Sequence, residues 1–259
     1  MIRKISFIGS GNVASHMATA LYKQGYEIIN IWSRNLNNAV SLSHKVKAVP
    51  LDNISQLDKK TDLYIIAIPD DQIVTMAKQL QKQLARRARI VHTSGATSVA
   101  SVSEYFKMAG VIWPLQSLSK GKKVSFKKLP LCITSTSPTL KKELLILCQS
   151  LSDQVQVISD DQKRILHLAA VFANNFSNHM YSIAHDLCTE HEIDFKLLQP
   201  LITETARKVT DQSPADMQTG PAIRGDHKSM ELHQKQLKKE KDILKLYQLI
   251  STNIQKQKP

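Results

Sequence analysis

The stretch Arg3–Arg34, RKISFIGSGNVASHMATALYKQGYEIINIWSR, decides the fold. Its first apolar run, residues 5–8, predicts a short strand that ends at a glycine. Gly9, Gly11 and Ala14 then fit the pattern G-x-G-x-x-A, an apolar helical pattern follows as far as Gly25, and residues 28–31 predict a second strand. Strand, turn, helix and strand is the context in which this motif indicates dinucleotide binding.

Each small residue of the motif has a physical purpose. Gly9 allows the tight turn, Gly11 lets the backbone approach a pyrophosphate, and Ala14 allows the helix to pack closely on the strand. The helix N-terminus offers unpaired N–H groups and a partial positive charge to the phosphates. We therefore expect the cofactor turn to consist of Gly9, Ser10, Gly11, Asn12 and Val13. The alternative is a helix cap whose glycines serve only the turn.

The end of the second predicted strand indicates which dinucleotide is bound. A site selective for NAD usually carries an acidic residue here that binds the ribose 2′-hydroxyl. This chain has Trp32-Ser33-Arg34-Asn35 instead. Ser33 and Asn35 can hydrogen-bond a 2′-phosphate and Arg34 can pair with it, so the sequence favours NADP over NAD. In the alternative interpretation, Arg34 is an ordinary surface cation.

Two later strands end in loops that reach the same edge of the predicted sheet. Residues 62–68 predict a buried strand that ends at Ile68 and Pro69, and residues 89–93 predict a strand followed by Ser94. Open α/β sheets bind ligands at the carboxyl ends of their strands. We therefore expect Ile68, Pro69 and Ser94 to contact the cofactor, with Ser94 on the nicotinamide or substrate side.

The remaining pattern predicts two domains. Strands are expected at residues 109–113, 129–134 and 155–158, with a helix over 138–151. From Asp160 the strand signals end, and helices are expected over residues 161–190, 195–210 and 226–256. The predicted fold class is α/β, with an N-terminal Rossmann doubly wound parallel sheet in residues 1–158 and an all-α C-terminal domain in residues 159–259.

The first helix of the second half carries polar residues in an apolar setting. Lys163, His167, Asn174 and Asn178 fall on one stripe of a regular α-helix, with Asn175 beside it. Buried polar groups need partners, so such a stripe favours a substrate cleft or another subunit. For His167 alone, a satisfied core histidine would be the favoured interpretation, and only its alignment with the other polar residues makes a functional role equally good.

A second polar group lies in residues 218–226, QTGPAIRGD. Arg224 could bind a carboxylate substrate as a charged fork. Alternatively, Arg224 pairs with Asp226, or Asp226 caps the following helix.

Composition excludes several function classes. The chain has 259 residues, 42% of them hydrophobic, a formal net charge of +13 and three cysteines. The lysines are dispersed, so a solvated basic face is favoured over a nucleic-acid site. The scattered cysteines predict no metal site. An apolar segment of membrane-spanning length and a signal peptide are both lacking, which predicts a cytoplasmic protein without membrane contact.

Six motifs occur together in a family-specific order. They are Gly9-Ser-Gly-Asn-Val-Ala14, Ile68-Pro-Asp70, His92-Thr-Ser-Gly95, Pro114-Leu-Gln116, Phe172-Ala-Asn-Asn-Phe176 and Thr219-Gly-Pro-Ala-Ile-Arg-Gly-Asp226. With them the chain resembles bacterial Rossmann-like oxidoreductases with a helical C-terminal domain of unknown function. More distantly, it is similar to deazaflavin-dependent NADP reductases, pyrroline carboxylate reductases and 6-phosphogluconate-type dehydrogenases.

The resemblance implies an NADP-binding domain, a helical dimerisation domain and an active site in the cleft between them. His167, Asn175, Arg224 and Asp226 match positions typical of the helical domain. The family commonly has histidine before Pro-Leu-Gln, where this chain has Trp113. This difference leaves His167 as the expected proton donor.

We therefore predict an NADP-dependent oxidoreductase that transfers a hydride between nicotinamide and a small, anionic carbonyl or imine. His167 would be the general acid, Asn175 would orient the substrate, and Arg224, close to Asp226, would hold its anionic group. A homodimer through the helical domain is expected. The alternatives are an NADP-binding sensor without turnover and, less favoured, a nucleic-acid-binding module.

Overall fold

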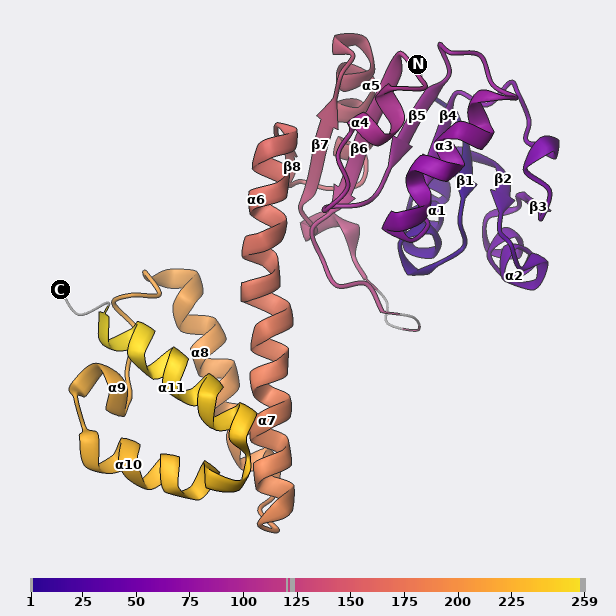
Figure 1. Cartoon of the computed structure of the whole chain (residues 1–259). Coiled ribbons are helices and arrows are strands. Elements are labelled where there is room, and N and C mark those ends of the chain that lie inside the picture. Colours follow the sequence, from indigo (N-terminus) through magenta and orange to yellow (C-terminus); the bar gives the residue numbers. More distant parts are fainter. Residues whose placement is uncertain (1, 120, 122–123, 257–259) are drawn as a thin grey trace. The chain divides into compact units, whose positions relative to one another are not determined.

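The computed structural model describes residues 2–119, 121 and 124–256 (Figure 1). The chain divides into two compact units, Met1–Ser177 and Asn178–Pro259. Strand β8 ends at Val157 and helix α6 begins at Asp160, so the sheet gives way to helices where the sequence predicts it. The domain boundary after residue 158 stays a prediction, because α6 belongs to the first compact unit.

The first unit contains an eight-stranded sheet with the strand order β3-β2-β1-β4-β5-β6-β7-β8. Its strands are β1 Lys4–Ile8, β2 Glu27–Trp32, β3 Val49–Leu51, β4 Leu63–Ile66, β5 Arg89–His92, β6 Met108–Pro114, β7 Leu131–Ser135 and β8 Val155–Val157. The helices of this unit are α1 Asn12–Lys23, α2 Leu36–Val46, α3 Ile73–Gln81, α4 Ala100–Ser103, α5 Pro138–Gln149 and α6 Asp160–Ala170. The order reverses at β1 and β4, so the Rossmann-like fold class is confirmed.

One strand pairing departs from the predicted parallel sheet. Strand β7 runs antiparallel to β6, with Ile112 opposite Ile133, and β8 is parallel to β7. The physical reason lies in the connection between Pro114 and Leu131, whose helical content among the described residues is the 3₁₀ turn Phe126–Lys128. Parallel neighbours usually need a crossover helix, so this connection is suited to an antiparallel return.

Both faces of the sheet are covered, which explains the continuous apolar runs of its strands. Helices α1, α2 and α5 pack on one face through buried residues such as Met17, Leu42 and Leu144. Helices α3 and α4 pack on the other face through residues such as Leu80 and Val102. The carboxyl ends of β1, β2, β4 and β5 are thereby held at one edge, where their loops form the candidate site.

The helix after the sheet is not a uniform α-helix. A π-helical segment, Val171–Phe176, follows α6 and leads into α7, Ser177–Glu190. A π-helical turn holds more residues than an α-helical turn, so it changes the angles of Asn174 and Asn178 relative to Lys163 and His167. Lys163 is buried whereas Asn174 and Asn178 are exposed, and the shared polar stripe stays a prediction.

In the second unit, α7 is followed by further helices. They are the 3₁₀ segment Phe195–Leu198, α8 Gln199–Asp211, α9 Pro221–Arg224, α10 His227–Gln236, the 3₁₀ segment Leu237–Lys239 and α11 Lys241–Lys256. Helix α9, which lies within the polar segment of residues 218–226, contacts both α10 and α11. Among the described residues, no helix has the length and apolarity to cross a membrane.

Candidate functional site

The turn after β1 has the geometry that the sequence predicts. Gly9 has φ +119°, and a Cβ atom there would lie 2.1 Å from the carbonyl oxygen of Ala67. Gly9 must therefore be glycine for two reasons, its backbone conformation and its close approach to the end of β4.

The N-terminus of helix α1 is open to a ligand. Gly11 is the N-cap, no side chain caps the helix, and its first turn contains no acidic residue. A Cβ atom at Gly11 would meet no heavy atom within 4 Å. Free backbone N–H groups and the positive end of the helix dipole therefore face open space, which fits a phosphate group.

The turn borders a cavity of about 430 Å³. Ten of the eleven residues predicted to contact the cofactor line it, namely Gly9, Ser10, Gly11, Asn12, Val13, Ser33, Arg34, Ile68, Pro69 and Ser94. Asn35 is the exception: its side chain caps α2 by accepting a hydrogen bond from the Asn37 N–H at 3.0 Å. The structure thus brings the ends of four strands around one hollow, although contact with a cofactor stays a prediction.

The cavity contains no acidic residue at the end of β2. Ser33 is buried there, and its Oγ accepts hydrogen bonds from Ser10 Oγ at 2.9 Å and from the Asn35 N–H at 3.4 Å. The side chain of Arg34 is exposed beside it. This end of the cavity therefore offers a hydroxyl and a guanidinium group to a ligand.

Sequence reasoning missed five residues that line the same cavity, namely Trp32, Ala67, Asp70, Thr93 and Leu118. Four of them are next to predicted residues at strand ends, so the same argument could have included them. Leu118 belongs to the long connection after β6, and it is placed by a hydrogen bond from Asn12 Nδ2 to its carbonyl oxygen, 3.0 Å long. No signal in the sequence links these two residues.

The predicted proton donor lies against the tryptophan that departs from the family pattern. The rings of Trp113 and His167 meet edge to face, with centroids 5.8 Å apart. The indole of Trp113 also covers Gly95, where a Cβ atom would lie 2.5 Å from its Cε2. The tryptophan therefore fixes one side of the half-buried His167 ring and restricts residue 95 to glycine.

The other predicted catalytic residues have different surroundings. Asn175 is exposed within the π-helical segment. Asp226 caps helix α10, accepting hydrogen bonds from the N–H of Ser229 at 3.1 Å and from its Oγ at 2.6 Å, and these hydrogen bonds lower the pKa of Asp226. Arg224 ends α9 with an exposed side chain. Catalytic roles for these three residues stay predictions.

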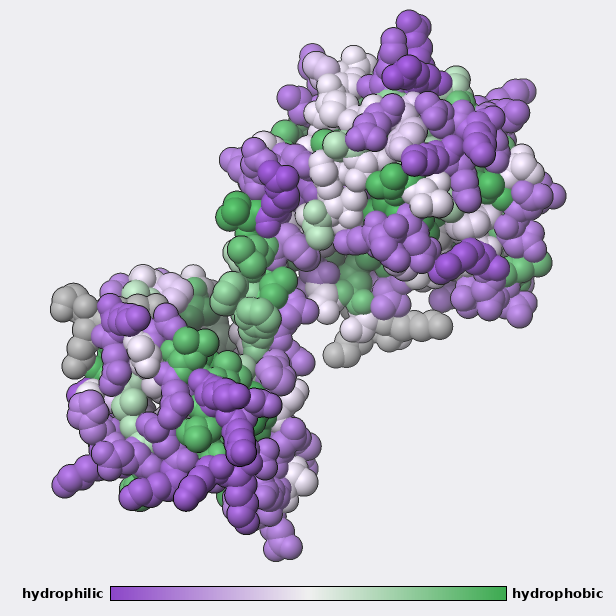
Figure 2. All heavy atoms as spheres, in the orientation of Figure 1, coloured by the Kyte–Doolittle hydropathy of each residue, from purple (hydrophilic) through white to green (hydrophobic). Residues whose placement is uncertain are grey.

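The helix that carries His167 also has an apolar side. Ile165, Leu168, Phe172 and Phe176 are all exposed, from 48% to 69%. Figure 2 shows hydrophobic residues gathered along this helix. The predicted homodimer depends on such a surface and stays a prediction.

A buried histidine lies beneath the loop after β5. His92 is fully buried, and its Nδ1 accepts a hydrogen bond from the Ser94 N–H at 3.2 Å. Burial lowers the pKa of His92 to about 4, and the positive charge of Lys163 adds to this effect. The imidazole is therefore neutral at pH 7.

This histidine makes stability depend on pH. Its folded-state pKa lies below the ordinary value of 6.5, so between these values the unfolded chain binds the proton more readily and stability falls as the pH is lowered. From pH 7 to pH 5, we expect His92 to remove about 2 kcal/mol from the free energy of unfolding. Urea unfolding at both pH values measures the change. His92→Asn, which keeps an acceptor for Ser94, should show a smaller loss, and an equal loss would contradict the assignment.

The fold and the cavity together define the class. A Rossmann-like sheet with a glycine turn at a helix N-terminus is a dinucleotide-binding unit, and the comparisons with known proteins agree. Residues 4–94 match the family model "NADP oxidoreductase coenzyme F420-dependent". Residues 129–254 match "Domain of unknown function (DUF2520)".

Solved structures give the family. A candidate NADP oxidoreductase from Bacteroides fragilis is 34% identical, with 98% of each chain covered and a TM-score of 0.89. The chain belongs to the family of this protein, an NAD(P)-dependent oxidoreductase family with a C-terminal DUF2520 domain. A protein from Thermotoga maritima, 22% identical with 98% of this chain and 97% of that chain covered, has the same fold with a TM-score of 0.76.

A curated relative is more distant. Glycerol-3-phosphate dehydrogenase [NAD(P)+] from Staphylococcus carnosus is 22% identical over 193 residues, which are 66% of this chain. The match spans 58% of that enzyme. The predicted family resemblance is thus confirmed, while the particular reaction is a matter for proposal.

Proposed function

We propose that this protein is an NADP-dependent oxidoreductase that transfers a hydride between the nicotinamide ring and a small, anionic carbonyl or imine compound. The cavity at the carboxyl ends of β1, β2, β4 and β5 carries the proposal. Its glycine turn and open helix N-terminus fit a pyrophosphate. Membership of an NAD(P)-dependent family supports the same conclusion.

The preference for NADP rests on the end of β2. Arg34 can pair with a 2′-phosphate and Ser33 can donate a hydrogen bond to it, whereas no carboxylate there would bind a free 2′-hydroxyl. When bound, the dinucleotide supplies or accepts the hydride. The chain itself orients the dinucleotide through the glycine turn and the N-terminus of α1.

His167 is the proposed proton donor to the substrate oxygen or nitrogen. Histidine has the side chain whose ordinary pKa is closest to neutrality, and the edge-to-face contact with Trp113 limits the orientations that the His167 ring can adopt. A donor whose ring is restricted in this way requires less reorganisation during proton transfer.

The test is NADPH oxidation followed at 340 nm with a panel of small keto acids and cyclic imino acids. With an accepted substrate, we expect His167→Ala to lower kcat about 100-fold or more, the usual contribution of a general acid. The Kd for NADPH should not change. His179→Ala, which alters an exposed histidine in α7, is the control and should keep full turnover. Full turnover by His167→Ala would remove this residue from the mechanism.

A sensor that binds NADP without turnover is the second candidate. The observation that favours it is Trp113, which stands where the family commonly has histidine and is buried against Gly95. Tight NADPH binding without oxidation by any compound of the panel would support the sensor.

A further inference from the structure

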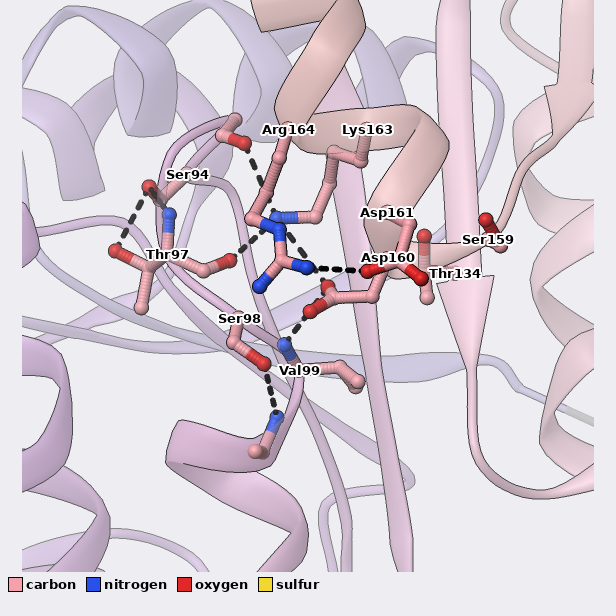
Figure 3. A network of polar contacts seen from close by, with 12 residues as sticks. Ser94, Thr97, Ser98, Val99, Thr134, Ser159, Asp160, Asp161, Lys163 and Arg164 are labelled. Carbon is pink, nitrogen blue, oxygen red and sulfur yellow. Dashed lines mark hydrogen bonds and ion pairs between the residues drawn. The ribbon is translucent and has the colours of Figure 1, made fainter.

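Lys163 is a charged side chain with no exposed surface. Its Nζ donates hydrogen bonds to the carbonyl oxygens of Gly95, at 3.1 Å, and Thr97, and it lies 3.5 Å from Asp160 Oδ1 (Figure 3). An ammonium group has three hydrogens, so these three acceptors use all of them. Lys163 therefore has no donor left for a substrate.

Asp160 extends the same contacts along the loop after β5. Its Oδ1 accepts a hydrogen bond from the Val99 N–H at 3.1 Å, and it is also hydrogen-bonded to Ser98. Burial lowers the pKa of Lys163, while the nearby Asp160 carboxylate opposes this effect. Asp160 and Lys163 are i, i+3 neighbours in the first turn of α6, so one helix end holds several backbone groups of the loop.

Hydrogen bonds between its own residues also stabilise the loop after β5. The Thr97 N–H donates to Ser94 Oγ at 2.9 Å, and Ser94 Oγ donates to Thr97 Oγ1 at 3.0 Å. Together with the contact from His92 to the Ser94 N–H, these hydrogen bonds restrict the conformation of residues 94–99. Its shape is therefore set jointly by β5 and α6.

This loop has a defined place in the candidate site. Thr93 and Ser94 line the cavity together with the ends of β1 and β4. In the strand order β2-β1-β4-β5, Ser33 and Arg34 lie at one end of the row and Ser94 at the other. A dinucleotide whose 2′-phosphate is at Arg34 and whose pyrophosphate is at the α1 N-terminus extends toward Ser94 with its nicotinamide half.

We propose that Lys163 and Asp160 are positioning residues for the nicotinamide half of the bound dinucleotide, acting by fixing the loop Ser94–Val99. This inference rests on the proposed NADP site. Burying a charge is costly unless it is paired and hydrogen-bonded. Carbonyl groups of this loop provide two of the three partners of Lys163, so the buried charge and the loop conformation stabilise each other.

The experiment compares two ligands on the full-length protein. NADPH reaches both ends of the cavity, whereas adenosine 2′,5′-bisphosphate lacks the nicotinamide half. Lys163→Met removes the charge and keeps the length of the side chain. We expect it to weaken NADPH binding about 10-fold or more through lost preorganisation, and to leave the affinity for the bisphosphate within about 2-fold. Calorimetric titration gives both Kd values.

Two further variants complete the design. Asp160→Asn keeps an acceptor for the Val99 N–H but loses the charge, and it should produce the same selective weakening to a smaller degree. If Lys163→Met does not fold, Asp160→Asn tests the inference in its place. Arg164→Met is the matched control, because Arg164 is the next residue of α6 and pairs with Asp161 on the exposed side. Neither Kd should change in this control.

A spectroscopic signal reports on the loop without any ligand. Trp113 covers Gly95, and in a Trp32→Phe background it is the remaining tryptophan. A released loop exposes the indole, so Lys163→Met should shift its emission to longer wavelength and Arg164→Met should not.

Equal weakening of both ligands by Lys163→Met, or unchanged binding of both together with unchanged emission, overturns the inference while the NADP site stands. Failure of the wild-type protein to bind either ligand instead overturns the proposed function, and the inference with it.

Discussion

Replacing Gly9 by alanine is expected to abolish dinucleotide binding and to destabilise the first unit. The alanine Cβ would lie 2.1 Å from the carbonyl oxygen of Ala67, and the backbone at φ +119° is one that L side chains rarely adopt. Strain of this kind costs about 1–3 kcal/mol, and displacement of the end of β4 adds to it. Urea unfolding and NADPH titration measure the two effects.

Gly25→Ala separates strain from steric overlap. Gly25 also has a positive φ, +87°, but a Cβ atom there would meet nothing within 4 Å. This variant should lose about 1 kcal/mol, the ordinary cost of a left-handed alanine, and keep its affinity for NADPH. If Gly9→Ala were no worse than Gly25→Ala in both measurements, the close approach of Gly9 to Ala67 would have no functional importance.

The first half of the fold could be predicted because its signals are local. The motif Gly9-x-Gly11-x-x-Ala14, the apolar strands and the polar residues at their ends all lie within short windows. Parallel strands end at a common edge, so ten predicted residues meet in one cavity without any further information. The direction of β7 could also have been predicted, since the described residues of the connection before it contain no crossover helix.

The contacts of Lys163 could not be predicted in this way. Gly95 and Lys163 are 68 residues apart, and no periodicity connects a loop to a helix at that distance. Regular α-helical spacing predicts a polar stripe that joins Lys163 to Asn174 and Asn178. The π-helical segment Val171–Phe176 changes the number of residues per turn between them, and π-helical turns are frequent at functional sites. The periodicity of apolar and polar residues does not predict a π-helical turn.

The preference for NADP is expected to depend on Arg34. Its guanidinium group is exposed at the rim of the cavity, beside the buried Ser33. A hydrogen-bonded pair between charged groups contributes about 1.5–3 kcal/mol. Arg34→Ala should therefore weaken NADPH binding about 10- to 100-fold, while the affinity for NADH, which has no 2′-phosphate, should change less than about 2-fold. Fluorescence titration of the bound nicotinamide gives both constants.

A charge control is needed, because removal of any cation from a chain of net charge +13 weakens its attraction for anions. Arg87→Ala removes the same charge from an exposed position between α3 and β5, away from the residues that line the cavity. It should leave the ratio of the NADPH and NADH constants unchanged. Added salt should screen the long-range part of both effects, so the selective loss in Arg34→Ala should persist at high ionic strength. Equal loss of affinity for NADPH and NADH in Arg34→Ala would contradict this prediction. Arg34 would then act only through the long-range electrostatic attraction of the positively charged protein, and it would not select the 2′-phosphate.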